Sequence, residues 1–196
     1  MEFNKDIFLL GIQWCGKWTQ AELLLKKLTN HKYYEMWETL RAFHSNDNLI
    51  GNYIKDRMNR GIMIDDFITF CLIDAALGIV EVNKQNILVD GFPRLKDQAD
   101  YIMDKMNKMN RNYVVIHFVL SKEKALERMV SRAQKEARKD DNPEAMKTRI
   151  EVFQKETLPI LENFKKLWKL IEINADDTIE NIFQETLNKL QIINNT

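Results

Sequence analysis

The chain has 196 residues, of which 45% are hydrophobic and 30% are charged, a balance typical of one folded domain. This composition excludes a disordered chain and a collagen-like repeat. Basic and acidic residues both number 29, so the formal net charge is +0 and the sequence indicates neither a nucleic-acid-binding nor a membrane-binding protein. Any site for an anion must therefore be a local cluster of positive groups.

The cysteines and the first residues predict a protein of the reducing cytoplasm. Cys15 and Cys71 lie too far apart for a CxxC or Cys/His zinc site, and two cysteines are too few for a disulfide framework. The segment Met1–Asp6 is polar and the apolar run after it is short. We therefore expect neither a signal peptide nor a membrane span.

Five short segments predict the strands of a sheet. Three unbroken apolar runs, at Ile7–Ile12, Asn86–Val89 and Tyr113–Leu120, indicate strands that are buried on both faces. Two further strands are expected at Leu170–Ile173 and near Tyr33–Met36.

Apolar residues at helical spacing fill the intervals between these strands. The predicted core-facing stripes are Ala21, Leu24, Leu25 and Leu28, then Phe67, Phe70, Leu72 and Leu77, and then Ile179, Ile182, Phe183, Leu187 and Leu190. Strands that alternate with helices predict a three-layer α/β fold around a parallel five-stranded sheet. Ligands of such sheets bind at the carboxyl ends of the strands.

A glycine-containing segment follows the first predicted strand and opens the first helix. Its pattern, GxxxxGK from Gly11 to Lys17, is that of a phosphate-binding loop, in which backbone N–H groups and a helix N-terminus surround phosphates while the lysine reaches the outer ones. The alternative is a strand-to-helix turn with a surface lysine. Trp14 and Trp18 stand where a phosphate should meet bare backbone.

Two further groups of residues could serve the same edge of the sheet. Asp90-Gly-Phe-Pro-Arg94 follows the strand that ends at Val89, where a carboxylate suits a water-mediated magnesium ion and a guanidinium suits phosphate. A structural Asp-Gly turn is the alternative. A later stretch supplies Arg128, Arg132, Arg138 and Arg149 around Asp140-Asp141, and it is either a solvated helix face or a set of charges for phosphoryl transfer.

Over nearly its whole length the chain resembles the adenylate kinases and, more widely, the nucleoside monophosphate kinases. The family loop G-x-P-G-x-G-K-G-T-Q is matched at Gly11, Gly16, Lys17, Thr19 and Gln20, whereas Gln13, Trp14 and Trp18 depart from it. The family motif D-G-[FY]-P-R is matched without change at Asp90–Arg94, and Gln98-Ala99 follows at the family's distance. Leu40-Arg41 and Gly61–Asp65 look like two further family segments, and Arg138-Lys-Asp140-Asp141 looks like R-x-D-D.

The resemblance implies a role for each matching residue. It places ATP at Gly11, Gly16, Lys17, Thr19, Gln20, Arg128 and Arg132, and AMP at Arg41, Ile64, Arg94, Gln98, Arg138 and Arg149. Catalysis would fall to Lys17, Arg94, Arg128, Arg132, Arg138 and Arg149, and Asp90 would help to hold Mg²⁺ through water. Gln98 would read the adenine edge of AMP, which favours AMP over uridine or cytidine monophosphate.

The resemblance also implies a reaction and an architecture. A monomeric, cytoplasmic enzyme would convert ATP and AMP to two ADP reversibly, by direct transfer. A single domain over residues 1–196 would have a P-loop core, a helical insertion for AMP near residues 34–66 and a short lid near 125–150. A short lid lacks the four-cysteine insert of some members, so no structural zinc is expected.

All four tryptophans stand where a glycine is expected. Trp14, Trp18 and Trp37 occupy glycine positions of the family, and Trp168 lies between an apolar helix and a strand, where a helix C′ glycine is common. Only 6 glycines remain in the chain. We hypothesise that these codons are UGA, which certain bacterial codes read as glycine; UGG in the DNA would refute this.

Two alternatives remain open from the sequence. One is a degenerate P-loop domain with genuine tryptophans, which holds a nucleotide weakly or not at all and acts as an interaction protein. The other is a kinase for a different nucleoside monophosphate.

Overall fold

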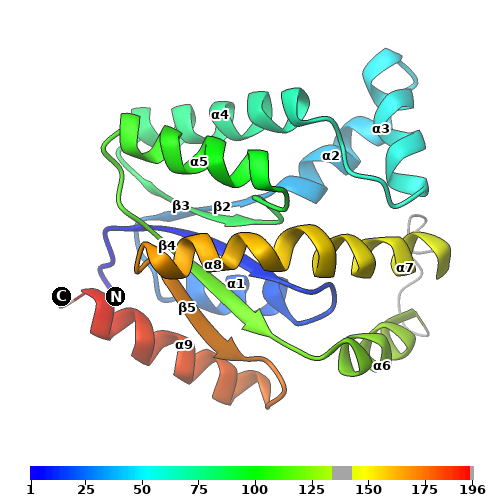
Figure 1. Ribbon diagram of the computed structural model, residues 1–196. Coiled ribbons are helices and arrows are strands. Elements are labelled where there is room, and N and C mark those ends of the chain that lie inside the picture. Colours follow the sequence, from blue (N-terminus) through cyan, green and yellow to red (C-terminus); the bar gives the residue numbers. More distant parts are fainter. Residues whose placement is uncertain (134–142, 195–196) are drawn as a thin grey trace.

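The computed structural model describes residues 1–133 and 143–194, and it contains a five-stranded parallel sheet (Figure 1). The strands are β1 (Asp6–Gly11), β2 (His31–Glu35), β3 (Asn86–Asp90), β4 (Tyr113–Val119) and β5 (Leu170–Asn174). Their order across the sheet is β2-β3-β1-β4-β5. All four neighbouring pairs are parallel, so every strand ends at the same edge.

Helices cover both faces of this sheet. They are α1 (Lys17–Leu25), α2 (Met36–His44), α3 (Leu49–Asn59), α4 (Asp66–Val82), α5 (Lys96–Lys108), α6 (Lys122–Ala133), α7 (Pro143–Val152), α8 (Leu158–Lys166) and α9 (Ile179–Asn194). A π-helical segment, η1 (Phe153–Thr157), joins α7 to α8 without a break. No helix of the described residues is both long and apolar enough to cross a membrane.

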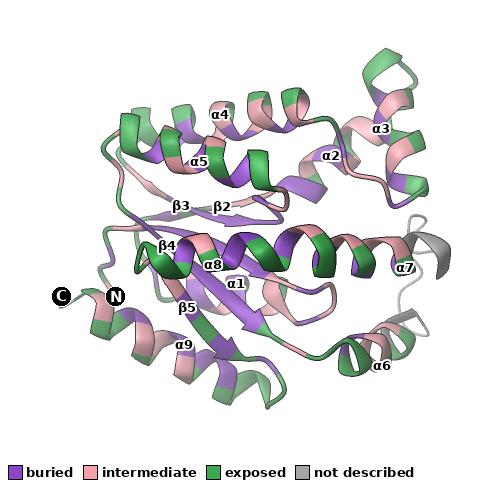
Figure 2. Ribbon diagram, in the orientation of Figure 1, coloured by how far each residue is buried: buried purple, intermediate pink, exposed green. Residues whose placement is uncertain are grey.

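Two hydrophobic clusters, one on each face, hold the three layers together. Phe8 and Leu10 of β1 pack with residues of α2 to α5 and α8, whereas Ile7 and Leu9 pack with residues of α1 and α9. Successive side chains of a strand point to opposite faces, so an unbroken apolar run supplies both clusters. Figure 2 shows β1, β3 and β4 almost entirely buried.

The predicted three-layer fold is confirmed, and most strand ends agree within one or two residues. The edge strand β2 begins two residues earlier than expected, at His31, and Met36 already starts α2. The stripe predicted on α4 was wrong at Phe67 but not at Leu77, which is buried, nor at Phe70 and Leu72, which pack against the core. Phe67 is 73% exposed, and the buried residues of that helix are Thr69, Ile73, Leu77 and Val80.

Candidate functional site

Three strands bring polar or glycine residues to one edge of the sheet. β1 ends at Gly11, β2 at Glu35 and β3 at Asp90. Asp90 lies opposite Glu35 in one neighbouring strand and opposite Leu9 in the other. Gly11, the last residue of β1, therefore lies two residues beyond the level of Asp90.

The loop between β1 and α1 has the backbone that its glycines predict. Gly11 has φ 154° and Gly16 has φ 95°, and α1 begins at Lys17 directly after Gly16. A side chain at Gly11 would clash, since an added Cβ would lie 2.8 Å from the carbonyl oxygen of Phe118. Trp14 has φ 63°, a left-handed conformation that costs a bulky residue about 1–3 kcal/mol.

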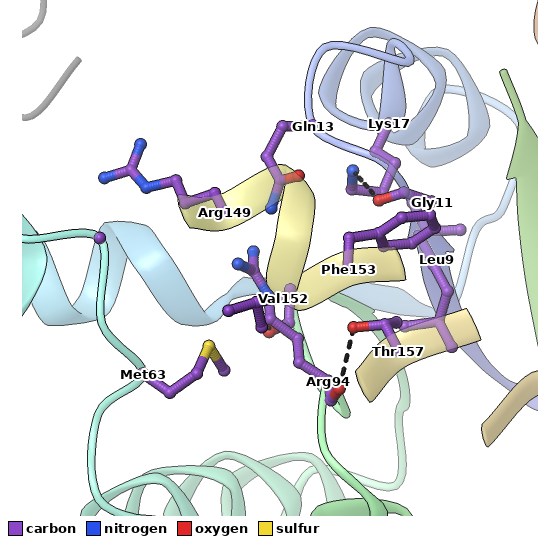
Figure 3. Close-up of a pocket in the computed structure, with 13 residues that line it drawn as sticks. Leu9, Gly11, Gln13, Lys17, Met63, Arg94, Arg149, Val152, Phe153 and Thr157 are labelled. Carbon is purple, nitrogen blue, oxygen red and sulfur yellow. Dashed lines mark hydrogen bonds between the residues drawn. The ribbon is translucent and has the colours of Figure 1, made fainter. Parts of the chain in front are cut away.

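The Lys17 ammonium points back into this loop. Its Nζ donates to the carbonyl oxygens of Gly11, at 2.9 Å, and Ile12, at 3.2 Å (Figure 3). Backbone oxygens of the loop thus accept the hydrogen bonds of the loop's own lysine. An incoming anion would have to draw Nζ away from these two acceptors.

Asp90, at the end of β3, is an acidic group that interacts electrostatically with Lys17. It is buried, and burial raises the pKa of its carboxyl group while the neighbouring Lys17 lowers it. The Tyr33 hydroxyl donates to Asp90 Oδ2 at 3.5 Å. A desolvated carboxylate beside a phosphate loop fits water-mediated binding of Mg²⁺, because a further cation would favour its charged form.

A cleft at this edge is lined by residues far apart in the sequence. They are Leu9, Leu10, Gly11, Gln13, Lys17, Gly61, Met63, Gly91, Arg94, Arg149, Val152, Phe153 and Thr157. Figure 3 shows Lys17 and Gly11 on one side of this space and Arg94 and Arg149 on others. The structure therefore brings together predicted residues from the loop, from the segment after β3 and from α7.

Two arginines of the cleft stack on a single indole. The Arg94 Cζ lies 4.8 Å from the centroid of the Trp37 ring, and the Arg149 Cζ lies 5.3 Å from it. An added Cβ on Gly91 would lie 3.2 Å from Trp37 Cδ1, so the indole also packs against the turn after β3. Trp37 is 9% exposed.

Comparison with known proteins assigns this arrangement to a family. The family model described as adenylate kinase matches residues 9–169. An adenylate kinase of Prochlorococcus marinus (strain AS9601) is 33% identical over 95% of this chain and 99% of its own length. This chain belongs to the adenylate kinase family. A further adenylate kinase, from Corynebacterium urealyticum, is 30% identical over 92% of the chain and 96% of the relative. A UMP-CMP kinase of Lentinula edodes is 29% identical over 92% and 82% respectively.

The adenylate kinase motif that begins at Asp90 is held in place by several hydrogen bonds. Arg94 Nε donates to the Gly91 carbonyl at 3.0 Å, and the Arg94 N–H donates to Gln98 Oε1 at 2.9 Å. The Thr157 hydroxyl of η1 donates to the Arg94 carbonyl at 2.8 Å. Gln98 Nε2 donates to Asp66 Oδ1 at 2.8 Å. These bonds fix the Arg94 backbone and leave its guanidinium tip directed at the cleft.

Other residues that the adenylate kinase resemblance selects lie outside the cleft lining. Arg41 pairs with Glu35 at 3.1 Å, and Ile64 is buried in the core. Gln20 donates to the Ile179 carbonyl at 3.1 Å, toward α9, and Thr19 lies in the first turn of α1. Arg128 approaches the loop from α6.

Arg128 touches the phosphate loop through backbone oxygens. Its Nη1 donates to the Cys15 carbonyl at 3.4 Å, and its Nη2 donates to the Ala175 carbonyl at 2.8 Å. Arg132 belongs to α6, but its side chain lies outside the described residues. Arg138, Asp140 and Asp141 also lie outside the described residues.

Sequence reasoning missed the wall of the cleft that α7 and η1 form. Val152, Phe153 and Thr157 line the cleft there, whereas Met63 lines it from the segment Gly61–Asp65 that the resemblance had selected. The sequence signal for these residues is weak, because an apolar residue on a helix normally indicates core packing. A π-helical segment at this point does mark the site, since such turns are frequent where function interrupts a helix.

The tryptophans at adenylate kinase glycine positions differ in what they do to the backbone. Trp14 and Trp168 both have positive φ, at 63° and 56°. Trp18 and Trp37 do not, and both lie in regular helix. The backbone conformation thus favours glycine at positions 14 and 168. At positions 18 and 37 the backbone is helical, so a requirement for glycine there would reflect a lack of room for a side chain.

No cluster of three or more His, Cys, Asp and Glu side chains that could hold a metal ion occurs within residues 1–133 and 143–194.

Proposed function

We propose that this chain transfers the γ-phosphoryl group of ATP to AMP, reversibly, giving two ADP. The proposal rests chiefly on the convergence of Lys17, Arg94 and Arg149 on one cleft of an adenylate kinase family member. Phosphoryl transfer consists mostly of positioning and of charge neutralisation, and this cleft offers an ammonium and two guanidinium groups for that purpose.

The transfer is a direct displacement. A phosphate oxygen of AMP attacks the γ-phosphorus of ATP, and the bond from that phosphorus to the β–γ bridging oxygen breaks. One ADP is the leaving group and the other is the product of attack. Lys17 would stabilise the negative charge on the transferred phosphoryl group, and Arg94 and Arg149 would bind the phosphate of AMP. Mg²⁺, when bound, would neutralise charge on the ATP phosphates, with Asp90 holding it through water.

The rest of the chain would serve this reaction by closing the cleft. We assign AMP binding to an insertion near residues 34–66, with Arg41, Ile64 and Gln98 around the nucleotide. We assign ATP binding to Gly11, Gly16, Thr19, Gln20, Arg128 and Arg132, and closure to a lid near 125–150 that includes Arg138. Closure would exclude water, which would otherwise hydrolyse ATP. The proposed enzyme is a cytoplasmic monomer of nucleotide biosynthesis, with no structural zinc.

Two other functions have an observation in their favour. Trp14 in the loop and Trp37 against the arginines favour a degenerate domain that binds nucleotide weakly and works as an interaction protein. The UMP-CMP kinase of Lentinula edodes, at 29% identity, favours a kinase for another nucleoside monophosphate.

A coupled assay for ATP formed from ADP separates these functions. It is run on the chain as written and on Trp14→Gly/Trp18→Gly/Trp37→Gly, and in the forward direction with AMP, UMP and CMP. Turnover with AMP in the glycine version supports the proposal and the recoding hypothesis together. Turnover with UMP or CMP alone would replace AMP as the substrate, and no turnover in either protein would favour the degenerate domain.

A further inference from the structure

Trp37, Arg94 and Arg149 meet although they come from three separate segments of the chain. Trp37 is the second residue of α2, Arg94 follows β3, and Arg149 lies in the last turn of α7. Both guanidinium groups are within 5.3 Å of the indole centroid. Gly91, which lines the cleft with both arginines, also contacts the indole.

This cluster contains two positive groups close together around a neutral ring. Burial lowers the pKa of the Arg94 guanidinium to about 10; Asp90 opposes this effect, and the nearby Arg149 adds to it. Arg41, another arginine that the family resemblance assigns to AMP, is held by Glu35 instead. Planar guanidinium groups that converge in a cleft are suited to a phosphate, which accepts paired hydrogen bonds from them.

The indole lies beside both guanidinium groups, within 5.3 Å of each Cζ. A phosphate held by both groups would have to come equally close to the two Cζ atoms, so ring and phosphate would compete for space between them. The indole is almost fully buried, and it packs against the Gly91 turn.

We propose that the Trp37 indole occupies the phosphate position of the monophosphate substrate, so that AMP binds tightly only when residue 37 has a small side chain. The inference rests on the proposed function for the identity of the ligand. The inference does not depend on the backbone of the phosphate loop. It concerns only the side chain at position 37, where the backbone is helical and does not require glycine.

The test measures AMP binding by calorimetry without ATP, so that Trp14 and Trp18 do not enter the result. Trp37→Gly and Trp37→Ala both remove the ring, and alanine keeps the helix propensity of the site. We expect AMP to bind at least about 10²-fold more tightly to both variants than to the parent, as charge-assisted hydrogen bonds become available. Thermal unfolding identifies a variant that has lost its fold.

Two control variants keep the comparison matched. Trp37→Phe retains an aromatic ring over the arginines, so its AMP binding should stay as weak as that of the parent. Trp168→Gly makes the same substitution before the start of β5, at the opposite edge of the sheet from the cleft, and should also leave AMP binding unchanged.

The outcomes separate this inference from the proposed function. Equal AMP affinity in the parent, Trp37→Gly and Trp37→Ala would overturn the inference, whatever the turnover of the glycine version of the enzyme. Tighter binding of UMP or CMP instead of AMP would uphold the blocked phosphate position and overturn the choice of AMP.

Discussion

Trp168 ends helix α8 in the same way that Gly61 ends helix α3. In each case the N–H of this residue donates to the carbonyl three residues earlier at 3.0 Å, and the next N–H donates to the carbonyl five residues before it. The two φ angles are 56° and 68°. Glycine adopts this conformation freely, whereas a residue with a Cβ pays about 1–2 kcal/mol.

Trp168→Gly should therefore stabilise the fold by about 1 kcal/mol, as the strain disappears while little packing is lost. Trp168 is 94% exposed, so its indole contributes almost no burial. The free energy of unfolding in urea measures the effect. Its neighbour Leu167 has φ −88°, and Leu167→Gly should instead reduce stability. A loss of stability in Trp168→Gly would contradict the strain argument.

Arg111→Met should destabilise the protein by about 3–5 kcal/mol, because it leaves a buried carboxylate without its counter-charge. Arg111 Nε and Nη2 lie 2.7 Å from Asp6 Oδ2 and Oδ1, and Asp6 is 1% exposed. The control is Lys108→Met, which breaks an exposed pair with Asp104 and should cost at most about 1 kcal/mol. Equal losses in urea unfolding would show that the Asp6 site is better solvated than its burial indicates.

Stability should fall as the pH is lowered below 6.5, and His31 should account for part of this fall. Burial lowers the pKa of His31 from 6.5. Its Nε2 lies 3.0 Å from the Lys5 carbonyl oxygen, and its buried Nδ1 has no hydrogen-bond partner within the described residues. The unfolded chain thus takes up a proton before the folded one does, so stability present above pH 6.5 is lost as the pH drops toward the lower folded pKa.

His31→Gln removes this titration and keeps a donor for the Lys5 carbonyl. The measurement is the free energy of unfolding at about pH 7 and about pH 5, in the parent and in the variant. The variant should lose less stability between the two values. Some dependence should remain, because burial also lowers the pKa of His117. An identical drop in both proteins would exclude His31 as a contributor.

Lys17→Met and Arg94→Ala should each reduce turnover by about 10²-fold or more, through loss of charge stabilisation in the transition state. Both are made in the Trp14→Gly/Trp18→Gly/Trp37→Gly background and measured with the coupled assay. Lys96→Met is the control, since Lys96 is exposed on α5 and pairs only with Asp100 among the described contacts. Turnover close to that of the background in both variants would remove these residues from the mechanism.

Much of the fold could be predicted because its central strands carry a strong signal. Ile7 to Leu10 supply alternate side chains to two cores, which requires an unbroken apolar run. β2 was less well placed, because an edge strand with the sequence His31–Glu35 is only partly apolar. On α4, apolar residues surround most of the helix, so the predicted stripe included the exposed Phe67 and left out the buried Ile73 and Val80.

The sequence predicted part of the cleft lining but not the contacts within it. Spacing and resemblance selected Gly11, Lys17, Arg94 and Arg149, all of which line the cleft. That Lys17 bonds to its own loop, and that Trp37 stacks on two arginines, depends on side-chain directions that one-dimensional patterns do not carry. The helix C′ position predicted for Trp168 is confirmed, because it follows from local chain geometry alone.

The central strand β1 cannot pair with both of its neighbours, β3 and β4, until more than half of this chain has been synthesised. Asp6 of β1 lies opposite Tyr113 of β4, so the N-terminal strand leaves the ribosome long before one of its two neighbours exists. Pairing between such distant segments is slow, and an apolar strand with an open edge is prone to aggregate in the meantime.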